Sequence, residues 1–102
     1  MRQRIKLLVR KNLKMSPGKI AAQCVHAALG LNEMYENKSY CYDVLGPELS
    51  VVVLEVSDAK FQEAKLVSRA GPYYLVQDAG FTEVAPNTET VLAFLEPDPR
   101  NT

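Results

Sequence analysis

Three polar side chains interrupt the alanine-rich stretch MSPGKIAAQCVHAALG (residues 15–30), namely Lys19, Gln23 and His26. Their spacing of i, i+4 and i+7 places them on one stripe of a helix. Lys19 would lie in the first turn, where free backbone N–H groups and the helix dipole already favour an anion, and it adds a full positive charge there. By spacing alone, a chance polar stripe with a snorkelling lysine is the better interpretation, and a single histidine is more often structural than catalytic.

A second group of polar residues lies in the segment DAGFTEVAPNT (residues 78–88). Asp78 directly follows an apolar run, Gly80 lets the backbone turn, and Thr82 and Thr88 offer hydroxyl groups. By spacing alone, an Asx-type turn in which Asp78 bonds its own loop is the favoured interpretation. A catalytic interpretation requires the fold to bring Asp78 beside the first group of polar residues.

Hydrophobic periodicity predicts the elements that would position these two groups. The predicted strands are residues 4–10, 50–56, 73–77 and 90–95, and the predicted helices are residues 17–36 and 59–70. Ser16 and Asp58 occupy the expected N-cap positions, Pro17 suits the first position of a helix, and Gly71 with Pro72 ends the second helix.

The side chains of these elements indicate which faces are buried. The first helix has an apolar stripe of Ile20, Cys24, Ala27, Ala28, Leu31 and Met34 or Tyr35. In the second helix, Phe61, Ala64 and Val67 are expected to face inward. The nearly continuous β-branched run of residues 50–56 predicts a central strand that is covered on both faces.

The order β-α-β-α-β-β predicts one α/β domain over residues 1–102, with helices flanking a mixed four-stranded sheet in three layers. The two helical crossovers make the first three strands parallel, whereas the helix-free connection of residues 78–89 returns the fourth strand antiparallel. Sites in such sheets gather beyond the carboxyl ends of the parallel strands. That rule predicts that residues 14–19 and residues 78–88 cluster, with Asp78 near Lys19.

Composition and charge narrow the class of protein. The chain has 102 residues, 47% hydrophobic content, and twelve basic and twelve acidic side chains. All seven basic residues of positions 1–32 precede the first acidic residue, Glu33, which is an asymmetry that suggests a polyanionic partner. Solvating lysines at strand ends explain the same asymmetry equally well.

Several classes of protein are not indicated by the sequence. No apolar run approaches the roughly 20 residues that span a bilayer, and the N-terminal apolar run is too short for a signal peptide. Cys24 and Cys41 form neither a CxxC motif nor a Cys/His cluster, so we expect no disulfide framework, no metal site and a reducing, cytoplasmic setting. Motifs for nucleotide binding and for the common hydrolases are also missing.

Two blocks of the chain, NLKMSPGKIAAQCVHAALG (residues 12–30) and QDAGFTEVAPNTETVLA (residues 77–93), resemble the signature blocks of the type II peptidyl-tRNA hydrolases. The segment SVVVLEVSD between them resembles the second strand of that family. The resemblance implies a translation enzyme that hydrolyses the ester joining a peptide to the 3′ ribose of tRNA, without a metal or other cofactor. It implies catalytic roles for Lys19, Asp78 and Thr88 and substrate contacts for Lys14, Gln23, His26 and Thr82.

The implied mechanism gives each group a role. Asp78 would orient or deprotonate the attacking water, Lys19 would stabilise the oxyanion, and Thr88 would hold a water or the substrate carbonyl. The basic N-terminal third would bind tRNA phosphates.

Four positions depart from the family pattern. Asn12, Pro17, Phe81 and Glu83 stand where an acidic residue, a basic residue, an arginine and a glutamine are usual. Family members also continue past the fourth strand into a helix, so a partner or a homodimer would be needed to cover the sheet face left open here. Two alternatives remain at this point: a non-catalytic relative that binds RNA or protein, and an enzyme of the same fold that acts on another ester or amide.

Overall fold

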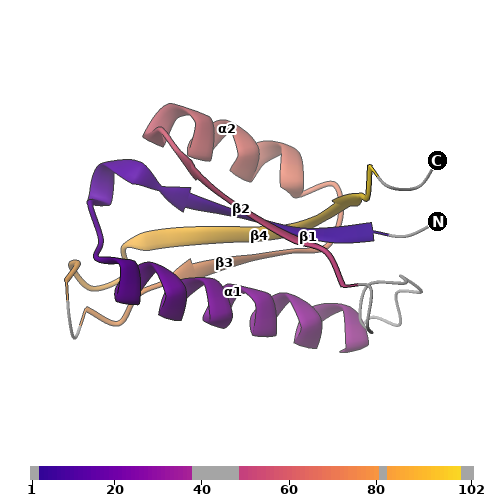
Figure 1. Cartoon of the computed structure of the whole chain (residues 1–102), viewed down its shortest axis with the longest axis horizontal. Helices are drawn as coiled ribbons and strands as arrows, with labels where there is room; N and C mark the ends of the chain where they lie inside the picture. The colour runs from indigo at the N-terminus through magenta and orange to yellow at the C-terminus, as the bar shows by residue number, and fades with distance from the viewer. Residues whose placement is uncertain (1–2, 38–48, 81–82, 100–102) are drawn as a thin grey trace.

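The structure is a computed structural model, and it describes residues 3–37, 49–80 and 83–99 (Figure 1). Its elements in chain order are β1 (Gln3–Arg10), the short 3-10 helix η1 (Lys11–Leu13), α1 (Pro17–Asn37), β2 (Val51–Val56), α2 (Asp58–Ser68), β3 (Tyr73–Gln77) and β4 (Glu89–Pro97). Every predicted helix and strand is present, with ends that differ by at most two residues. Phe81, which departs from the family pattern, and Thr82, a predicted substrate contact, lie outside the described residues.

The four strands form one mixed sheet in the order β2-β1-β4-β3. β1 pairs in parallel with β2, and β4 pairs antiparallel with both β1 and β3. β1, β2 and β3 therefore run in the same direction and β4 runs against them, as the connections predicted. α1 and α2 lie on opposite faces of the sheet, which gives three layers (Figure 1).

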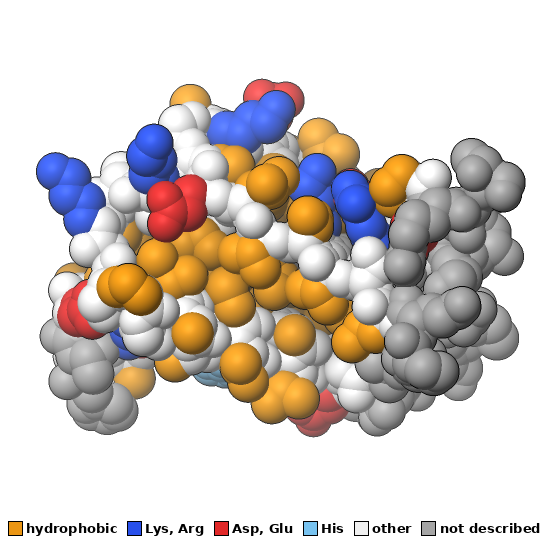
Figure 2. Space-filling view, viewed as in Figure 1, with side chains coloured by type: hydrophobic (Ala, Val, Ile, Leu, Met, Phe, Trp, Pro, Cys, Tyr) orange, Lys and Arg blue, Asp and Glu red, His pale blue; other side chains and the backbone are white. Residues whose placement is uncertain are grey.

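The prediction of a central, doubly covered second strand is wrong, because β2 is an edge strand. Val51 and Val53 are each 46% exposed, and Leu54 is 43% exposed. The antiparallel strand β4 pairs with the other side of β1 and takes the central place instead. α1 packs mainly on β1, β3 and β4, and among the described residues apolar side chains are visible between α1 and α2, where β2 forms the edge of the sheet (Figure 2).

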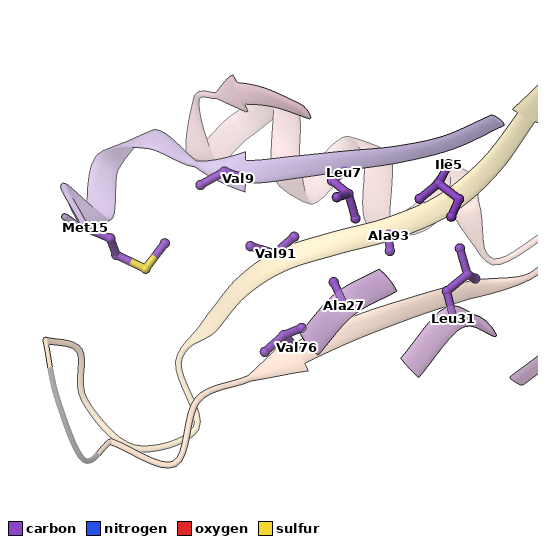
Figure 3. Close-up of a cluster of buried hydrophobic side chains, with 9 residues drawn as sticks. All are labelled: Ile5, Leu7, Val9, Met15, Ala27, Leu31, Val76, Val91 and Ala93. Atoms are coloured by element: carbon purple, nitrogen blue, oxygen red, sulfur yellow. The ribbon is translucent and has the colours of Figure 1, made fainter. Parts of the chain in front are cut away.

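The core has two parts, one on each face of the sheet. Between α1 and the sheet, a buried cluster comprises Ile5, Leu7, Val9, Met15, Ala27, Leu31, Val76, Val91 and Ala93 (Figure 3). On the α2 face, Phe61 packs against Leu8 and Leu92. Successive residues of β1 and β4 therefore serve opposite cores, as the alternation of side chains along a strand requires.

Two details of α2 differ from the prediction. Ser57, rather than Asp58, is the N-cap, because its side chain accepts a hydrogen bond from the Lys60 backbone N–H at 3.2 Å. Asp58 is instead the first helical residue and forms an ion pair with Arg10 at 2.9 Å. Val67 is 70% exposed and does not face inward, because α2 contacts the sheet mainly through Phe61 and leaves its last turn beside an open groove.

Gly30 sets the close approach of α1 to β3, which leads to a first prediction. A Cβ atom at this position would lie 2.6 Å from the ring of Tyr74, whereas a Cβ at Gly18 in the same helix would meet nothing within 4 Å. We expect Gly30→Ala to lower the free energy of unfolding by about 1–2 kcal/mol, because the cost of overpacking exceeds the gain in helix propensity. Urea unfolding measures this, and Gly18→Ala is the matched control.

Gly18→Ala should be neutral or slightly stabilising, since it keeps the helical backbone and finds open space. Equal stability of the Gly30 and Gly18 variants would contradict the close packing of α1 on Tyr74.

Candidate active site

Lys19 and Asp78 form a direct ion pair where α1 begins and β3 ends. Lys19 Nζ lies 2.6 Å from Asp78 Oδ1, and the two side chains are only 11% and 7% exposed. The topology thus brings together two residues that lie 59 positions apart in the chain. A buried, hydrogen-bonded pair of opposite charges at the carboxyl edge of a sheet is a typical place for chemistry.

The start of α1 aims Lys19 at this edge. Ser16 is the N-cap, as predicted, since its Oγ accepts a hydrogen bond from the Lys19 backbone N–H at 3.2 Å and its carbonyl accepts one from Ile20 at 2.9 Å. Lys14 adopts a left-handed conformation with φ of 52° and reverses the chain after η1. The Lys19 side chain therefore projects from the first helical turn, beside backbone N–H groups that carry partial positive charge.

Gln23 orients the carboxylate from the next turn of α1. Its Nε2 donates to Asp78 Oδ1 at 3.2 Å, and its Oε1 accepts a hydrogen bond from the hydroxyl of Thr90, which is fully buried. This chain of hydrogen bonds from β4 through α1 to the carboxylate fixes which end of the Gln23 amide faces Asp78.

Thr90 is a residue of the site that the sequence analysis missed. Regular alternation along β4 would put Thr90 on the same face as Leu92, toward α2. The pairing of β3 with β4 shifts register between Leu75 and Gln77, so that β4 has one extra residue there. Such a bulge re-aims side chains, which allows Thr90 to point toward α1. No local sequence signal marks it.

The loop after β3 holds the second oxygen of the carboxylate. Asp78 Oδ2 accepts a hydrogen bond from the Gly80 N–H at 2.7 Å, so the predicted Asx-type turn is present together with the ion pair. Gly80 has a φ of 83°, and a Cβ there would lie 2.6 Å from Pro86. The turn therefore requires glycine at this position.

These contacts set the protonation state of Asp78. The hydrogen bond from Lys19 is the largest cause that lowers the pKa of the carboxyl below its ordinary value, and the Gly80 N–H, the Lys19 charge and Gln23 act in the same direction. Burial opposes them and raises the pKa, but by less. Asp78 is therefore a carboxylate at neutral pH, and a weak base.

The other predicted site residues fall in different places. Thr88 lies at the end of the loop, and its carbonyl accepts a hydrogen bond from the Asp78 N–H at 2.9 Å. His26 is exposed and its ring centroid lies 6.0 Å from that of Tyr74, along α1 from the ion pair. Lys14 is exposed and lines a groove of about 400 Å³. Thr82 lies outside the described residues.

The basic excess of the N-terminal third is largely neutralised in three dimensions. Four of its cations pair with carboxylates from later in the chain: Arg4 and Lys6 with Glu96, Arg10 with Asp58, and Lys19 with Asp78. Lys11 and Lys14 are exposed and lie in one groove, which Arg10, Met15, Ile20 and Glu55 also line. In the part of this third that the structure describes, the exposed cations are Lys11 and Lys14.

A carboxylate from the β3–β4 loop also contacts the start of α1. Glu83 Oε1 accepts a hydrogen bond from the Ser16 N–H at 2.7 Å, and Oε2 accepts one from the Ser16 hydroxyl. The hydrogen bonds to Ser16 are the main reason that the pKa of Glu83 lies below its ordinary value. Among the described residues, no three His, Cys, Asp or Glu side chains gather where they could hold a metal ion, and no helix is long and apolar enough to cross a bilayer.

Comparison with known proteins gives consistent matches. A family model described as Peptidyl-tRNA hydrolase PTH2 matches residues 4–102. The peptidyl-tRNA hydrolase of Methanothermobacter thermautotrophicus is 36% identical over 88 residues, which cover 84% of this chain and 79% of that protein. That of Methanopyrus kandleri is 39% identical over 90 residues, with 84% and 78% covered. The human protein named peptidyl-tRNA hydrolase 2, mitochondrial, is 35% identical over 98 residues, which span 84% of this chain but 51% of that protein.

Proposed function

The chain belongs to the peptidyl-tRNA hydrolase family PTH2, and from this premise we propose that its Lys19–Asp78 pair carries the family's reaction, hydrolysis of peptidyl-tRNA. The resemblance noted in the sequence is thereby confirmed. The observation that carries the assignment of the site is the buried ion pair, with Nζ 2.6 Å from Oδ1, at the edge where the signature blocks meet.

In the proposed reaction, a water oxygen bonds to the ester carbonyl carbon, and the bond from that carbon to the ribose oxygen breaks. The peptide leaves as a carboxylic acid, and the second proton of the water ends on the ribose oxygen. Asp78 orients the water through a lone pair of Oδ2 and shares its proton as the bond forms. A carboxylate with a lowered pKa is a poor base, so orientation is its larger contribution.

Lys19 supplies the positive charge in this mechanism. Its ammonium donates to Asp78, and its positive charge stabilises the developing oxyanion. The side chain is already desolvated and held by Asp78, so little reorganisation accompanies the reaction. Gln23 keeps the carboxylate oriented, and Thr88, at the end of the same loop, holds a water or the substrate carbonyl. His26, exposed on the same stripe of α1, and Thr82 contact more distant parts of the substrate.

Binding of tRNA is assigned to the groove that Lys11 and Lys14 line. The two lysines are exposed, whereas four other cations of the N-terminal third are engaged in ion pairs. Met15 and Ile20 also line the groove, and Ile20 directly follows Lys19, so a bound phosphate would lie near the ester. This is a narrower tRNA surface than the charge distribution along the sequence suggests.

Lys14→Ala tests this assignment. We expect KM for a peptidyl-tRNA substrate to rise about three- to ten-fold with kcat unchanged, and the slope of log affinity against log salt to fall by about one, because one phosphate contact is lost. Steady-state kinetics over a series of salt concentrations measures both quantities. Arg69→Ala is the control, since it removes an exposed cation beyond the last turn of α2. Identical salt slopes for the wild type and Lys14→Ala would exclude the phosphate contact.

The activity itself is tested by incubating the purified chain with N-blocked aminoacyl-tRNA and following release of free tRNA. Release supports the proposal. Retention of the RNA without release would indicate a binding module. The absence of both release and retention would indicate that the enzyme acts on another substrate.

Three further points extend the proposal. Both core clusters share one sheet, which supports a single domain over residues 1–102. The free thiol of Cys24 suits the reducing conditions of the cytoplasm.

The exposed valines of the edge strand β2 support a homodimer in which this strand pairs with the same strand of a second copy. Sedimentation analysis would show a monomer if that pairing does not occur.

A further inference from the structure

Glu83 contacts the N-terminus of α1 with both oxygens of its carboxylate. One oxygen accepts the Ser16 backbone N–H at 2.7 Å, and the other accepts the Ser16 hydroxyl. Both bonds are charge-assisted, and together they fix the carboxylate in two directions. Glu83 and Ser16 are exposed and 67 positions apart, so the contact joins two surface segments and adds little to the core.

This contact reaches Lys19 through the backbone. Ser16 Oγ, which donates to Glu83, also accepts the hydrogen bond from the Lys19 N–H at 3.2 Å. The same helical turn is held a second time by the bond from Lys19 Nζ to Asp78 at 2.6 Å. Two carboxylates of the β3–β4 connection therefore hold the first turn of α1. Asp78 binds the Lys19 side chain, and Glu83 binds the N-cap residue Ser16. In Figure 1 the β3–β4 connection lies at the end of the molecule where α1 begins.

We propose that Glu83 is a positioning residue for the Lys19–Asp78 pair, and that it acts by clamping the β3–β4 loop to the first turn of α1. The inference rests on the proposed function of that pair. The loop has other internal bonds, such as the Asn87 N–H to the Asp78 carbonyl at 2.6 Å, but these do not reach the helix. Loss of the clamp removes one of the two contacts that hold the turn carrying Lys19, and a displacement of about 1 Å at a catalytic group can cost on the order of 100-fold in rate.

The charge of Glu83 gives the proposal a distinctive signature. Its carboxylate interacts electrostatically with Lys19 and lies beside the proposed active site, at the start of α1. Removal of a negative charge there cannot weaken binding of tRNA by electrostatics. A positioning role therefore predicts a lower kcat with KM unchanged or reduced, whereas a lost substrate contact predicts a higher KM.

The test compares Glu83→Ala with Glu83→Gln in the tRNA-release assay. We expect kcat to fall about ten-fold in Glu83→Ala with KM equal or lower, and to stay within about three-fold of the wild type in Glu83→Gln, whose amide still accepts from Ser16. Glu63→Ala is the matched control, because it removes an exposed carboxylate from α2 and should leave both constants unchanged. Urea unfolding of each variant checks that the fold is intact.

A double-variant cycle with Ser16→Ala makes the test sharper. Ser16→Ala removes the hydroxyl bond to Glu83 but keeps the bond from the Ser16 backbone N–H, so the two substitutions share part of one contact. The loss in the double variant should therefore be smaller than the product of the two single losses. Ser57→Ala removes the equivalent cap of α2 and controls for lost capping alone. Three results would each overturn the clamp: a wild-type kcat in Glu83→Ala, an equal decrease in kcat in Glu83→Ala and Glu83→Gln, or additive decreases in the cycle with Ser16→Ala. An inactive wild type would instead contradict the proposed function.

Discussion

Lys19→Met is expected to lower kcat for release of tRNA from peptidyl-tRNA by about 100- to 1,000-fold. Removal of one preorganised oxyanion donor has an effect of this size in other enzymes. Methionine keeps most of the volume of the side chain and removes the charge, so the change reports on electrostatics rather than on a cavity. Single-turnover release of free tRNA at saturating enzyme measures the chemical step without the contribution of binding.

The chain provides a matched control for this substitution. Lys65 Nζ also lies 2.6 Å from a carboxylate, that of Glu89, and its side chain is 19% exposed, but it belongs to α2 on the other face of the sheet. Lys65→Met breaks an ion pair of the same length and should leave the release rate unchanged. A rate in Lys19→Met close to that of the control would remove Lys19 from the mechanism.

Asp78→Asn is expected to lower kcat by about 100- to 10,000-fold, the range associated with loss of a positioned acid–base group. The amide keeps the shape of the side chain and can still accept from the Gly80 N–H, but it offers no negative charge to Lys19 or to the attacking water. The same single-turnover assay measures the loss. Glu89→Gln, which neutralises the partner of Lys65, is its control. Retention of more than about a tenth of the wild-type rate in Asp78→Asn would contradict the role assigned to the carboxylate.

The lowered pKa of Asp78 gives this substitution a pH signature. Because the native carboxyl binds its proton less readily than the unfolded one, the stability that it contributes is present above its ordinary pKa. That stability is lost as the pH falls through the lower native value. Lys19 is the main cause of the shift, so in Lys19→Met the pKa of Asp78 rises toward the ordinary value, and stability should be less sensitive to its titration. Urea unfolding from neutral pH into the acid range should show a smaller acid-dependent loss in Lys19→Met and in Asp78→Asn than in the wild type.

Local sequence signals predicted the helices and strands, and the order of these elements predicted that Lys19 and Asp78 lie close together. Ser16 and Pro17 mark the start of α1, and a glycine with a proline follows the end of α2, because caps depend on a few neighbouring residues. The same locality explains the error at α2, where Ser57 and Asp58 are both good capping residues and only the backbone decides between them. The pairing of Lys19 with Asp78 was predictable because helical crossovers put the carboxyl ends of parallel strands at one edge.

The positions of residues relative to distant neighbours were not predictable in this way. A run of β-branched residues is compatible with a central strand and with an edge strand. β2 is at the edge because β4, rather than another strand beyond β2, pairs with the free side of β1. Thr90 points at Gln23 because of a bulge relative to β3, which no property of β4 alone reveals.

By itself, the sequence determined which helices and strands form, the family, and the two segments that meet at the site, since these depend on local periodicity, on the residues of the two signature blocks and on the order of the elements along the chain. Only the tertiary structure decided that four N-terminal cations are neutralised by later carboxylates, that Lys11 and Lys14 are exposed, and that Glu83 bonds Ser16. The physical reason is that hydrogen bonds and ion pairs act over a few ångströms in space. The residues that they join here lie up to 92 positions apart along the chain.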